Sequence, residues 1–323
     1  MTFPLTTRLM QGLPRDTTPL VRRLAVASLV SQIAIVVTGG AVRLTASGLG
    51  CPEWPRCTAD SIVTTPEMGF HGVIEFGNRL LTFVLVIIAV AMIVSLLRLR
   101  RGRKDLFRLS IGLFLGIPAQ AVIGGITVWT GLNPWIVGLH FIVSMVLVAL
   151  ATVLVNRARL SAAQHALGRA PAAPPLLRQL LVTSTVLTSI AIVLGVVVTG
   201  SGPHAGDHGA ARNGLDSDLV TRFHALPVYL LVATVALALV VVWRSGVHAK
   251  LRKALVLLGA VVLVQGVIGY TQHFLHLPVA LVALHMLGAS LLMAAAVHAQ
   301  YTGTTQRTLP GTTLDSRVPQ TVA

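Results

Sequence analysis

Long apolar stretches recur along the whole chain and are separated by short polar segments. A helix of about 20 apolar residues is long enough to cross the hydrocarbon core of a bilayer. No water is available there to bond the backbone, so such stretches form helices. The pattern predicts eight transmembrane helices, at residues 23–43, 72–97, 107–130, 135–155, 177–200, 223–243, 251–271 and 278–298.

Composition and charge agree with a membrane protein. Hydrophobic residues make up 54% of the 323 residues and charged residues only 11%, which excludes an ordinary soluble domain. The net charge of +15 comes from Arg and Lys before the first span and in every second loop after it, whereas the alternate loops hold most acidic residues. By the positive-inside rule, this distribution predicts a plasma-membrane protein with both termini in the cytoplasm, and no nucleic-acid partner.

The two cysteines of the chain, Cys51 and Cys57, lie in the predicted outer loop SGLGCPEWPRC. Six positions apart in an oxidising compartment, they can close a small ring. Such a ring either staples the loop over the outer surface or takes part in redox chemistry.

The two halves of the chain repeat one design. His140 and His285 each begin an apolar run and are 145 positions apart, and Gln120 and Gln265 are separated by the same interval. Each half has four spans, so both halves share one orientation. We predict an all-α membrane protein of two repeated four-helix bundles, related by a pseudo-twofold axis along the membrane normal. Its predicted parts are an N-terminal half, an Ala- and Pro-rich cytoplasmic linker, a C-terminal half and a disordered tail, at residues 1–157, 158–176, 177–301 and 302–323.

Histidines near the outer ends of these spans are the strongest functional signal. An imidazole is costly to place in lipid and usually binds metal or haem, or relays protons. His224 and His285 fall within the first two turns of their spans, at one depth. Facing helices of a bundle can aim two imidazoles at one haem iron, so we interpret this pair as axial haem ligands. Nearby small residues leave room for a flat macrocycle, although they also permit close helix packing.

The N-terminal half has only part of this ligand set. His140 occupies the position equivalent to His285, but Asn78, a poor haem ligand, takes the position of His224. His71 lies seven residues before Asn78 on the same helical face. A site with one firmly held axial position can accept and release a haem, whereas two histidines retain theirs.

An acidic residue, Glu75, lies between His71 and Asn78. It stands four residues before Arg79, a spacing that favours an ion pair. Glu75 is therefore either half of a salt bridge or a carboxylate beside a bound ligand, and the missing second haem ligand favours the latter.

Several longer motifs surround these residues: TGGAVRLTASGLGCPEWPRC, EFGNR, QAVIGGITVWTGLNPWIVGLH, TGSGPHAG, RFH and QGVIGYTQHFLHLPVALVALH. Together they resemble the haem A synthase family, whose members make the haem of terminal cytochrome oxidases. The likeness covers all eight spans. The family's Glu-x-x-His-Arg motif reads Glu75-Phe-Gly-Asn78-Arg79 here, without its histidine.

The resemblance implies an oxidoreductase that converts one ring methyl of haem O to a formyl group by two hydroxylations, after which the geminal diol loses water. Glu75 would be its catalytic residue. A resident haem b would be held in the C-terminal half by His224 and His285, with Arg222 at its propionates. The residues implied for a substrate haem site in the N-terminal half are His140, His71, Asn78, Arg79 and Arg43. Arg43, like Arg222, is a candidate for haem propionates, and an ordinary place at the membrane interface is the alternative for these two arginines.

The resemblance also implies partners and matches Cys51 and Cys57 to the family's outer-loop cysteine pair. The partners are haem O as substrate, a haem O synthase (farnesyltransferase) as its supplier, an electron acceptor of unidentified chemistry, and membrane lipid.

Two rival functions are a b-type cytochrome that only transfers electrons, and a two-repeat transporter with proton-relaying histidines. Electron transfer by such a cytochrome does not require the Glu75 carboxylate, and the transporter would contain no haem.

Overall fold

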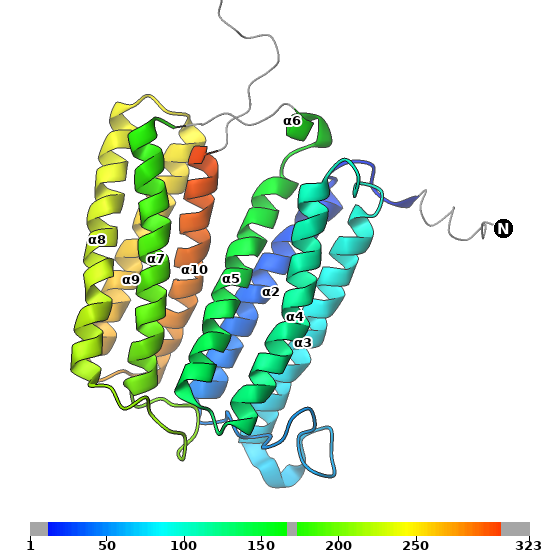
Figure 1. The fold of residues 1–323 in the computed structure, drawn as a ribbon, viewed down its shortest axis with the longest axis vertical. Coiled ribbons are helices and arrows are strands. Elements are labelled where there is room, and N and C mark those ends of the chain that lie inside the picture. The colour runs from blue at the N-terminus through cyan, green and yellow to red at the C-terminus, as the bar shows by residue number, and fades with distance from the viewer. Residues whose placement is uncertain (1–11, 167–172, 305–323) are drawn as a thin grey trace, which may run out of the picture.

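The computed structural model describes residues 12–166 and 173–304. In these ranges every regular element is a helix, and eight helices are long and apolar enough to cross a membrane (Figure 1). These eight are α2 (Pro19–Leu44), α3 (Gly69–Leu96), α4 (Lys104–Trp129), α5 (Pro134–Ala158), α7 (Pro175–Ser201), α8 (Ser217–Arg244), α9 (Ala249–Phe274) and α10 (Val279–Thr304). Two short helices, η1 (Pro66–Met68) and α6 (Ala162–Ala166), lie in the connections. The predicted number of spans is confirmed.

Most helices are longer than the predicted spans because local signals outside the apolar runs set their ends. Proline occupies the first turn of α2, α5 and α7, where its missing N–H is not needed. The Asp216 side chain accepts a hydrogen bond from the Leu219 amide at 2.8 Å and caps α8. Polar helix ends of this kind carry no hydrophobic signal.

Two predicted irregular segments are partly helical. The predicted tail began at 302, but α10 continues to Thr304, because Gly303 lets its last turn approach the Leu181 side chain of α7. The predicted linker at 158–176 contains α6 and the start of α7. The remainder of both segments, at 167–172 and 305–323, lies outside the described residues.

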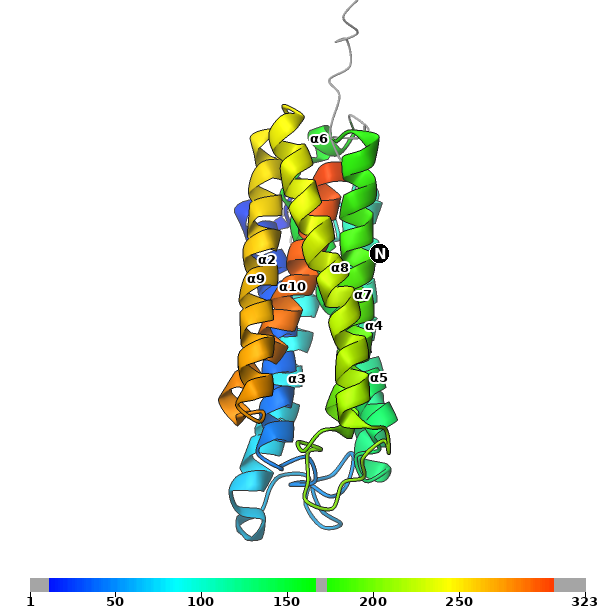
Figure 2. The same cartoon turned by 90° about the vertical axis from the view of Figure 1, so that its left-hand side faces the viewer.

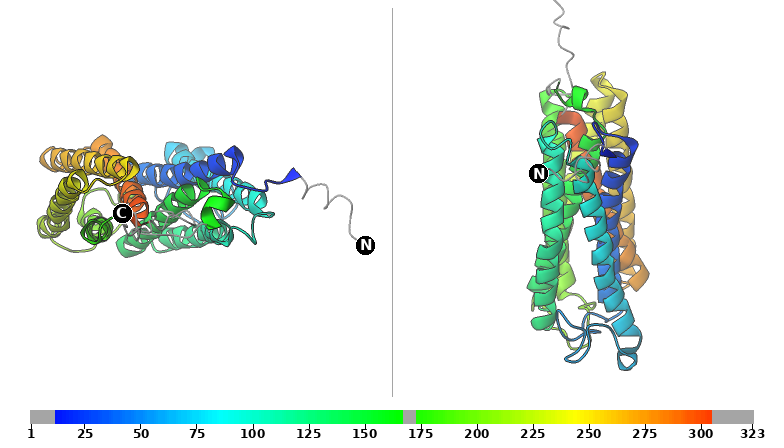
Figure 3. Two further views of the ribbon diagram at one scale, coloured as in Figure 1. Left: turned by 90° about the horizontal axis from the view of Figure 1, so that it is seen from above. Right: turned by 90° about the vertical axis from the view of Figure 1, so that its right-hand side faces the viewer.

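The eight helices form two closed rings of four. In α2–α5 and again in α7–α10, each helix packs against its neighbours along the chain, and the first packs against the fourth. All eight run along one long axis (Figures 1 and 2), and the two rings lie side by side when seen from above (Figure 3). They meet where α5 contacts α10, flanked by contacts of α2 with α10 and of α5 with α7.

The two ends of the molecule differ in charge. α2 begins and α10 ends at the same end (Figure 1), which we call the basic end because the connections at 97–103, 159–161 and 245–248 and their flanks carry Arg and Lys. The opposite end, with the connections at 45–68, 130–133, 202–216 and 275–278, is called the acidic end. This sorting of charge is the one expected for helices that cross a membrane.

Packing differs between these ends as well. Fully buried leucines and methionines concentrate in the half of each ring nearer the basic end, including Met92, Leu96, Leu106, Leu154, Leu177, Leu181, Leu251 and Leu255. Toward the acidic end, Gly124, Gly195 and Gly269 instead lie against histidine rings of neighbouring helices. An apolar core therefore fixes the helices at the basic end, and small residues make room for polar rings at the other.

The turn between the third and fourth helix has the same hydrogen bonds in both halves. The Leu132 amide donates to the Thr127 carbonyl at 2.8 Å, and the Leu277 amide donates to the Gln272 carbonyl at 2.7 Å. Leu132 and Leu277 both adopt a φ of 61°. The interval of 145 residues seen in the sequence therefore extends to the backbone of this turn.

A buried arginine joins α4 to the end of α5 at the basic end. The Arg103 side chain is 0% exposed and donates to the carbonyls of Leu160 at 2.6 Å and Arg157 at 2.9 Å. It also pairs with the Asp105 carboxylate at 3.1 Å. The N–H groups of this buried guanidinium thus find acceptors within the protein.

We expect Arg103→Gln to lower the stability of the purified protein by about 3 kcal/mol, because two carbonyls and a carboxylate each lose a charged donor. Thermal unfolding followed by tryptophan fluorescence measures this loss. Arg100→Gln, at a neighbouring exposed arginine, is the control and should change stability by less than about 0.5 kcal/mol. Equal melting temperatures for the two variants would contradict a structural role for Arg103.

Candidate functional site

His224 of α8 is half-buried and oriented by α7. Its Nδ1 donates to the Ala191 carbonyl at 2.9 Å. A Cβ added at Gly195 would lie 3.1 Å from the imidazole Cε1, so this glycine makes room for the ring. Since Nδ1 carries the proton of this bond, Nε2 keeps its lone pair. Metal-binding histidines are held in this way.

His285 of α10 lies against α9. A Cβ added at Gly269 would lie 3.3 Å from its Cε1, and Gln265 Nε2 donates to the His285 main-chain carbonyl at 2.8 Å. Its Nδ1 is buried and has no hydrogen-bond partner among the described residues. Buried polar atoms are normally paired, so this imidazole has unused bonding capacity.

His140 of α5 repeats the contacts of His285. Gln120 Nε2 donates to the His140 main-chain carbonyl at 3.0 Å, and a Cβ at Gly124 would lie 3.4 Å from the imidazole Cε1. Its Nδ1 is likewise buried without a partner in the described part of the chain. Glutamine, glycine and histidine therefore form the same arrangement in both halves.

The positions of His224 and His285 suit one shared ligand. They lie seven and six positions after the first residues of α8 and α10, which both run inward from the acidic end. With a rise of about 1.5 Å per residue, their Cα atoms share nearly one depth. In the C-terminal ring, α8 and α10 occupy opposite corners, each packed on α7 and α9. The two histidines thus lie at nearly the same depth, on helices at opposite corners of the ring.

The equivalent residues of α3 are engaged by other side chains. Thr38 Oγ1 of α2 donates to the Asn78 Oδ1 at 2.7 Å. His71 is exposed nearer the acidic end, and its Nδ1 lies 2.9 Å from the Ser47 Oγ. Both predicted substrate-site residues therefore face α2 and the segment that follows it, each through a hydrogen bond.

Glu75 and Arg79 hold the loop that follows α2. Glu75 is 6% exposed, and its carboxylate accepts from the Arg79 guanidinium at 2.5 Å and from the Cys51 amide. Arg79 also donates to the carbonyls of Cys51 at 3.0 Å, Glu53 at 3.1 Å and Arg56 at 2.9 Å. The salt bridge considered from the sequence is thus present. It belongs to a clamp, the set of hydrogen bonds from Glu75 and Arg79 that holds residues 51–57.

Cys51 and Cys57 form the expected disulfide, and both are fully buried. Within this ring, Trp54 packs edge-to-face on Trp129 with ring centroids 5.3 Å apart, and its carbonyl accepts from the Trp129 indole at 3.2 Å. A side chain at Gly125 would overlap the Trp54 indole. The disulfide loop therefore seats on α4 beside the Gly124–His140 contact.

The two arginines predicted at haem propionates are placed differently. Arg43, in the last turn of α2, donates to the Thr199 carbonyl at 2.8 Å and to the His204 carbonyl at 2.5 Å, and so links the N-terminal half to the C-terminal half. Arg222 is exposed in the second turn of α8. Arg222 is open to a ligand at the surface, whereas Nε and Nη2 of Arg43 are bonded to the main chain.

Several residues of this region were missed by sequence reasoning. Thr38, Ser47, Trp54 and Trp129 contact the predicted residues or the disulfide loop. Trp54 could have been found, because it lies inside the motif CPEWPRC. Thr38 and Ser47 could not, because only the packing of α2 on α3 brings them to their partners.

The donor set fits haem better than a bare metal ion. Among the described residues there is no group of three or more His, Cys, Asp or Glu side chains that could hold an ion. A haem iron receives four ligands from its porphyrin and needs at most two from the protein. His224 and His285 can supply two, and His140 can supply one.

Fold and site define an eight-helix membrane protein whose two four-helix rings each carry partly buried imidazoles toward one end. The family described as cytochrome oxidase assembly protein (COX15-CtaA) matches residues 22–297. The chain belongs to this family.

Relatives in several bacteria are named "Heme A synthase". The chain is 34% identical to that of Geobacillus kaustophilus over 146 residues, which cover 42% of this chain and 44% of the relative. Identity is 34% over 125 residues with the protein of Lysinibacillus sphaericus, covering 38% and 39% of the two chains. With that of Symbiobacterium thermophilum it is 26% over 181 residues, covering 55% and 58%. The matched segments therefore span about half of the relatives' length.

We expect Arg79→Gln to release the disulfide loop, because three main-chain carbonyls lose a donor and Glu75 loses its counter-charge. Amides of residues 51–57 should exchange hydrogen faster, and stability should fall by about 2–4 kcal/mol. Arg56→Gln is the control, since the Arg56 side chain is exposed and, among the described residues, bonds only to the Ala59 carbonyl of its own loop. Unchanged exchange in Arg79→Gln would show that the clamp does not hold the loop.

Proposed function

We propose that this protein is a haem A synthase, which oxidises a ring methyl group of haem O to the formyl group of haem A. The observation that carries the proposal is the recurrence of one glutamine–glycine–histidine arrangement in two rings, with a histidine at the position of His224 in one ring and Asn78 at that position in the other. This asymmetry suits a retained haem in one half and a substrate haem in the other. The relatives named "Heme A synthase" support it.

The two rings are related, in this proposal, by a pseudo-twofold axis along the membrane normal that passes between α5 and α10. Such an axis pairs α5 with α10 and exchanges the α2–α10 contact with the α5–α7 contact, which is the set of contacts between the rings. The repeated turns at Leu132 and Leu277 support the same relation. The basic end faces the cytoplasm, so the protein lies in the plasma membrane with both termini inside.

The C-terminal half holds the resident haem b. His224, whose Nδ1 is fixed on the Ala191 carbonyl and whose Nε2 is free of that bond, and His285 of α10 would hold its iron. Arg222 pairs with a propionate at the surface. These residues would thereby provide a redox centre between the substrate and an external electron acceptor. Hydrogen bonds of the protein orient both residues, and the glycines beside the two imidazoles, Gly195 and Gly269, leave space for the rings.

The N-terminal half holds haem O as substrate. His140 provides the one firm iron ligand, and Asn78, committed to Thr38, provides no comparable second one. His71 and the exposed part of Arg79 lie toward the acidic end, where the substrate enters and leaves, and Arg43 closes the side that faces the other ring. Because the iron is held from one side only, product can dissociate.

Glu75 is the catalytic residue of this site. In each hydroxylation a C–H bond of the ring methyl gives up a proton and two electrons, and water adds as C–OH with loss of a second proton. The electrons leave to the external acceptor. The geminal diol formed by two such steps loses water to give the formyl group. A carboxylate at the methyl stabilises positive charge that develops on the carbon, or accepts the proton that leaves it. Each Glu75 oxygen accepts one hydrogen bond, from the Cys51 amide and from Arg79, and so keeps a lone pair for the substrate.

We expect Glu75→Gln to lower haem A formation by at least about 100-fold in cells supplied with haem O. Glutamine keeps an oxygen for the Cys51 amide but carries no charge, so the loop stays in place and haem b stays bound. Extracted haems are separated by chromatography, and haem b is measured from the spectrum of the purified protein. Glu67→Gln, at an exposed acidic residue of the same end, is the control. Undiminished haem A in Glu75→Gln would reject the catalytic role.

Leucine at the two repeat-related glycines should separate the two haem sites. Gly269→Leu pushes the His285 imidazole aside, so the purified protein should lose its resident haem b and the associated Soret band. Gly124→Leu displaces His140 only and should keep haem b while haem A formation falls. Equal haem b content in both variants would contradict the assignment of His285 as its ligand, and a colourless wild-type protein would favour a transporter.

A further inference from the structure

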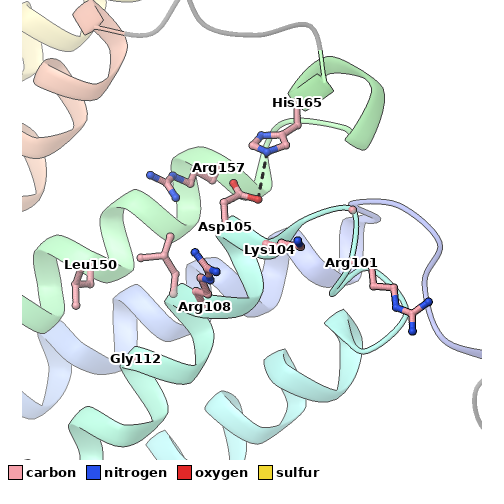
Figure 4. A pocket seen from close by; sticks show the side chains of 10 residues that line it. Arg101, Lys104, Asp105, Arg108, Gly112, Leu150, Arg157 and His165 are labelled. Atoms are coloured by element: carbon pink, nitrogen blue, oxygen red, sulfur yellow. Dashed lines mark ion pairs between the residues drawn. The ribbon is translucent and has the colours of Figure 1, made fainter.

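A second candidate binding site lies at the basic end, whereas His140, His224 and His285 lie toward the acidic end. There, a cavity of about 720 Å³ lies between α4, α5 and α6 (Figure 4). Four cationic side chains line it: Arg101, Lys104, Arg108 and Arg157. None of the residues proposed to bind haem is among its lining residues.

The charge of this cavity is not balanced by the protein. Its lining includes one carboxylate, Asp105, which Arg103 engages at 3.1 Å and His165 at 3.6 Å. Within 12–166 and 173–304, no side-chain hydrogen bond or ion pair engages Arg101, Lys104 or Arg108.

Arg157 adds an independent sign of a missing anion. Its Nε is buried and lacks an acceptor among the described residues. A buried guanidinium N–H without an acceptor is costly. Figure 4 shows Arg157 of α5 and Arg108 of α4 on the two sides of the cavity. An anion placed between them would satisfy both.

The part of the cavity that lies further along the membrane-spanning helices is apolar, and it is open at the surface, where Gly112 is exposed. Leu109 and Leu150 line it on α4 and α5, and Gly112 of α4 has open space where a Cβ would stand. These residues lie about one to two turns inside the membrane-spanning segments, below the charged rim. A soluble anion has no apolar part that could contact these residues, whereas a lipid has acyl chains that can.

The wall formed by α6 is fixed from outside the cavity. Asp16, before α2, accepts a hydrogen bond from the Ala162 amide at 2.7 Å, and this bond holds the pKa of Asp16 below its usual value. Thr17 donates to the Leu160 carbonyl at 2.9 Å. The cavity is thus part of the folded structure rather than a gap beside a loose loop.

We propose that this cavity binds an anionic phospholipid of the surrounding membrane. Its phosphate lies between the guanidinium groups of Arg108 and Arg157, with Lys104 and Arg101 at the rim, and one acyl chain follows the slot over Gly112. Basic pockets between transmembrane helices are suited to such headgroups. The bound lipid joins α4 to α5 at the end where these helices are most tightly packed.

The test uses the full-length protein, stripped of lipid in detergent and then mixed with phosphatidylglycerol or phosphatidylcholine. Native mass spectrometry counts retained lipid. Wild type should retain phosphatidylglycerol in preference to phosphatidylcholine. Lys104→Gln/Arg108→Gln/Arg157→Gln should weaken that retention on the order of 100-fold. The control, Arg244→Gln/Lys250→Gln/Lys253→Gln, removes equal charge from the other half and should retain it. Equal loss in both triple variants would overturn the site.

A second variant distinguishes a lipid from a free phosphate. Gly112→Leu fills the apolar slot without touching a charged residue, so the protein should fold and lose phosphatidylglycerol. Glycerophosphoglycerol, the soluble headgroup, should bind wild type far more weakly than the lipid does. Tight binding of this headgroup together with full lipid retention in Gly112→Leu would mean a phosphate site and overturn the proposal. Because haem is not part of either readout, this outcome is independent of haem A synthase activity.

Discussion

The hydrogen bond from a glutamine amide to the main-chain carbonyl of a histidine sets the geometry on which the rest of the site depends. It joins Gln120 to His140 in one ring and Gln265 to His285 in the other. In an apolar bundle a polar side chain must find its partner inside the protein. This bond therefore fixes how the fourth helix lies on the third, and the glycine one turn along the third helix then accommodates the imidazole. Because Nδ1 of each imidazole has no hydrogen-bond partner in the described part of the chain, the arrangement holds a histidine in place and leaves its ring nitrogens able to bind.

The two halves share this arrangement and differ in the residues of the second helix that lie opposite the histidine. In the C-terminal half, His224 is held by the Ala191 carbonyl and keeps Nε2 available. In the N-terminal half, the equivalent residue is Asn78, and the space near the acidic end is occupied by the disulfide loop. Glu75 and Arg79 bind that loop, so the proposed catalytic carboxylate and the outer covering form one unit. Any motion of the loop must change the surroundings of Glu75, which suits a site through which substrate passes.

Packing divides the molecule by depth. Near the basic end, large apolar side chains and the buried Arg103 hold each ring together. Toward the acidic end, glycines replace them beside the histidines. A rigid base of this kind allows polar and cofactor-binding groups at the other end to depart from dense apolar packing without loss of the fold. The cationic cavity beside α4, α5 and α6 lies at the rigid end, where a bound lipid would add to helix packing rather than to the chemistry.

The sequence by itself determined the number of spans, the halves and the interval that relates them, because hydrophobic length and repeated letters are local properties. It also identified Glu75 with Arg79, whose spacing of four places both on one helical face. The tertiary structure alone decided what those residues contact. That Glu75 also accepts the Cys51 amide, that Arg43 crosses to the other ring, and that Asn78 meets Thr38 all follow from how α2 packs against α3 and α10. Helix packing depends on side chains far apart in the chain, and no local pattern records it.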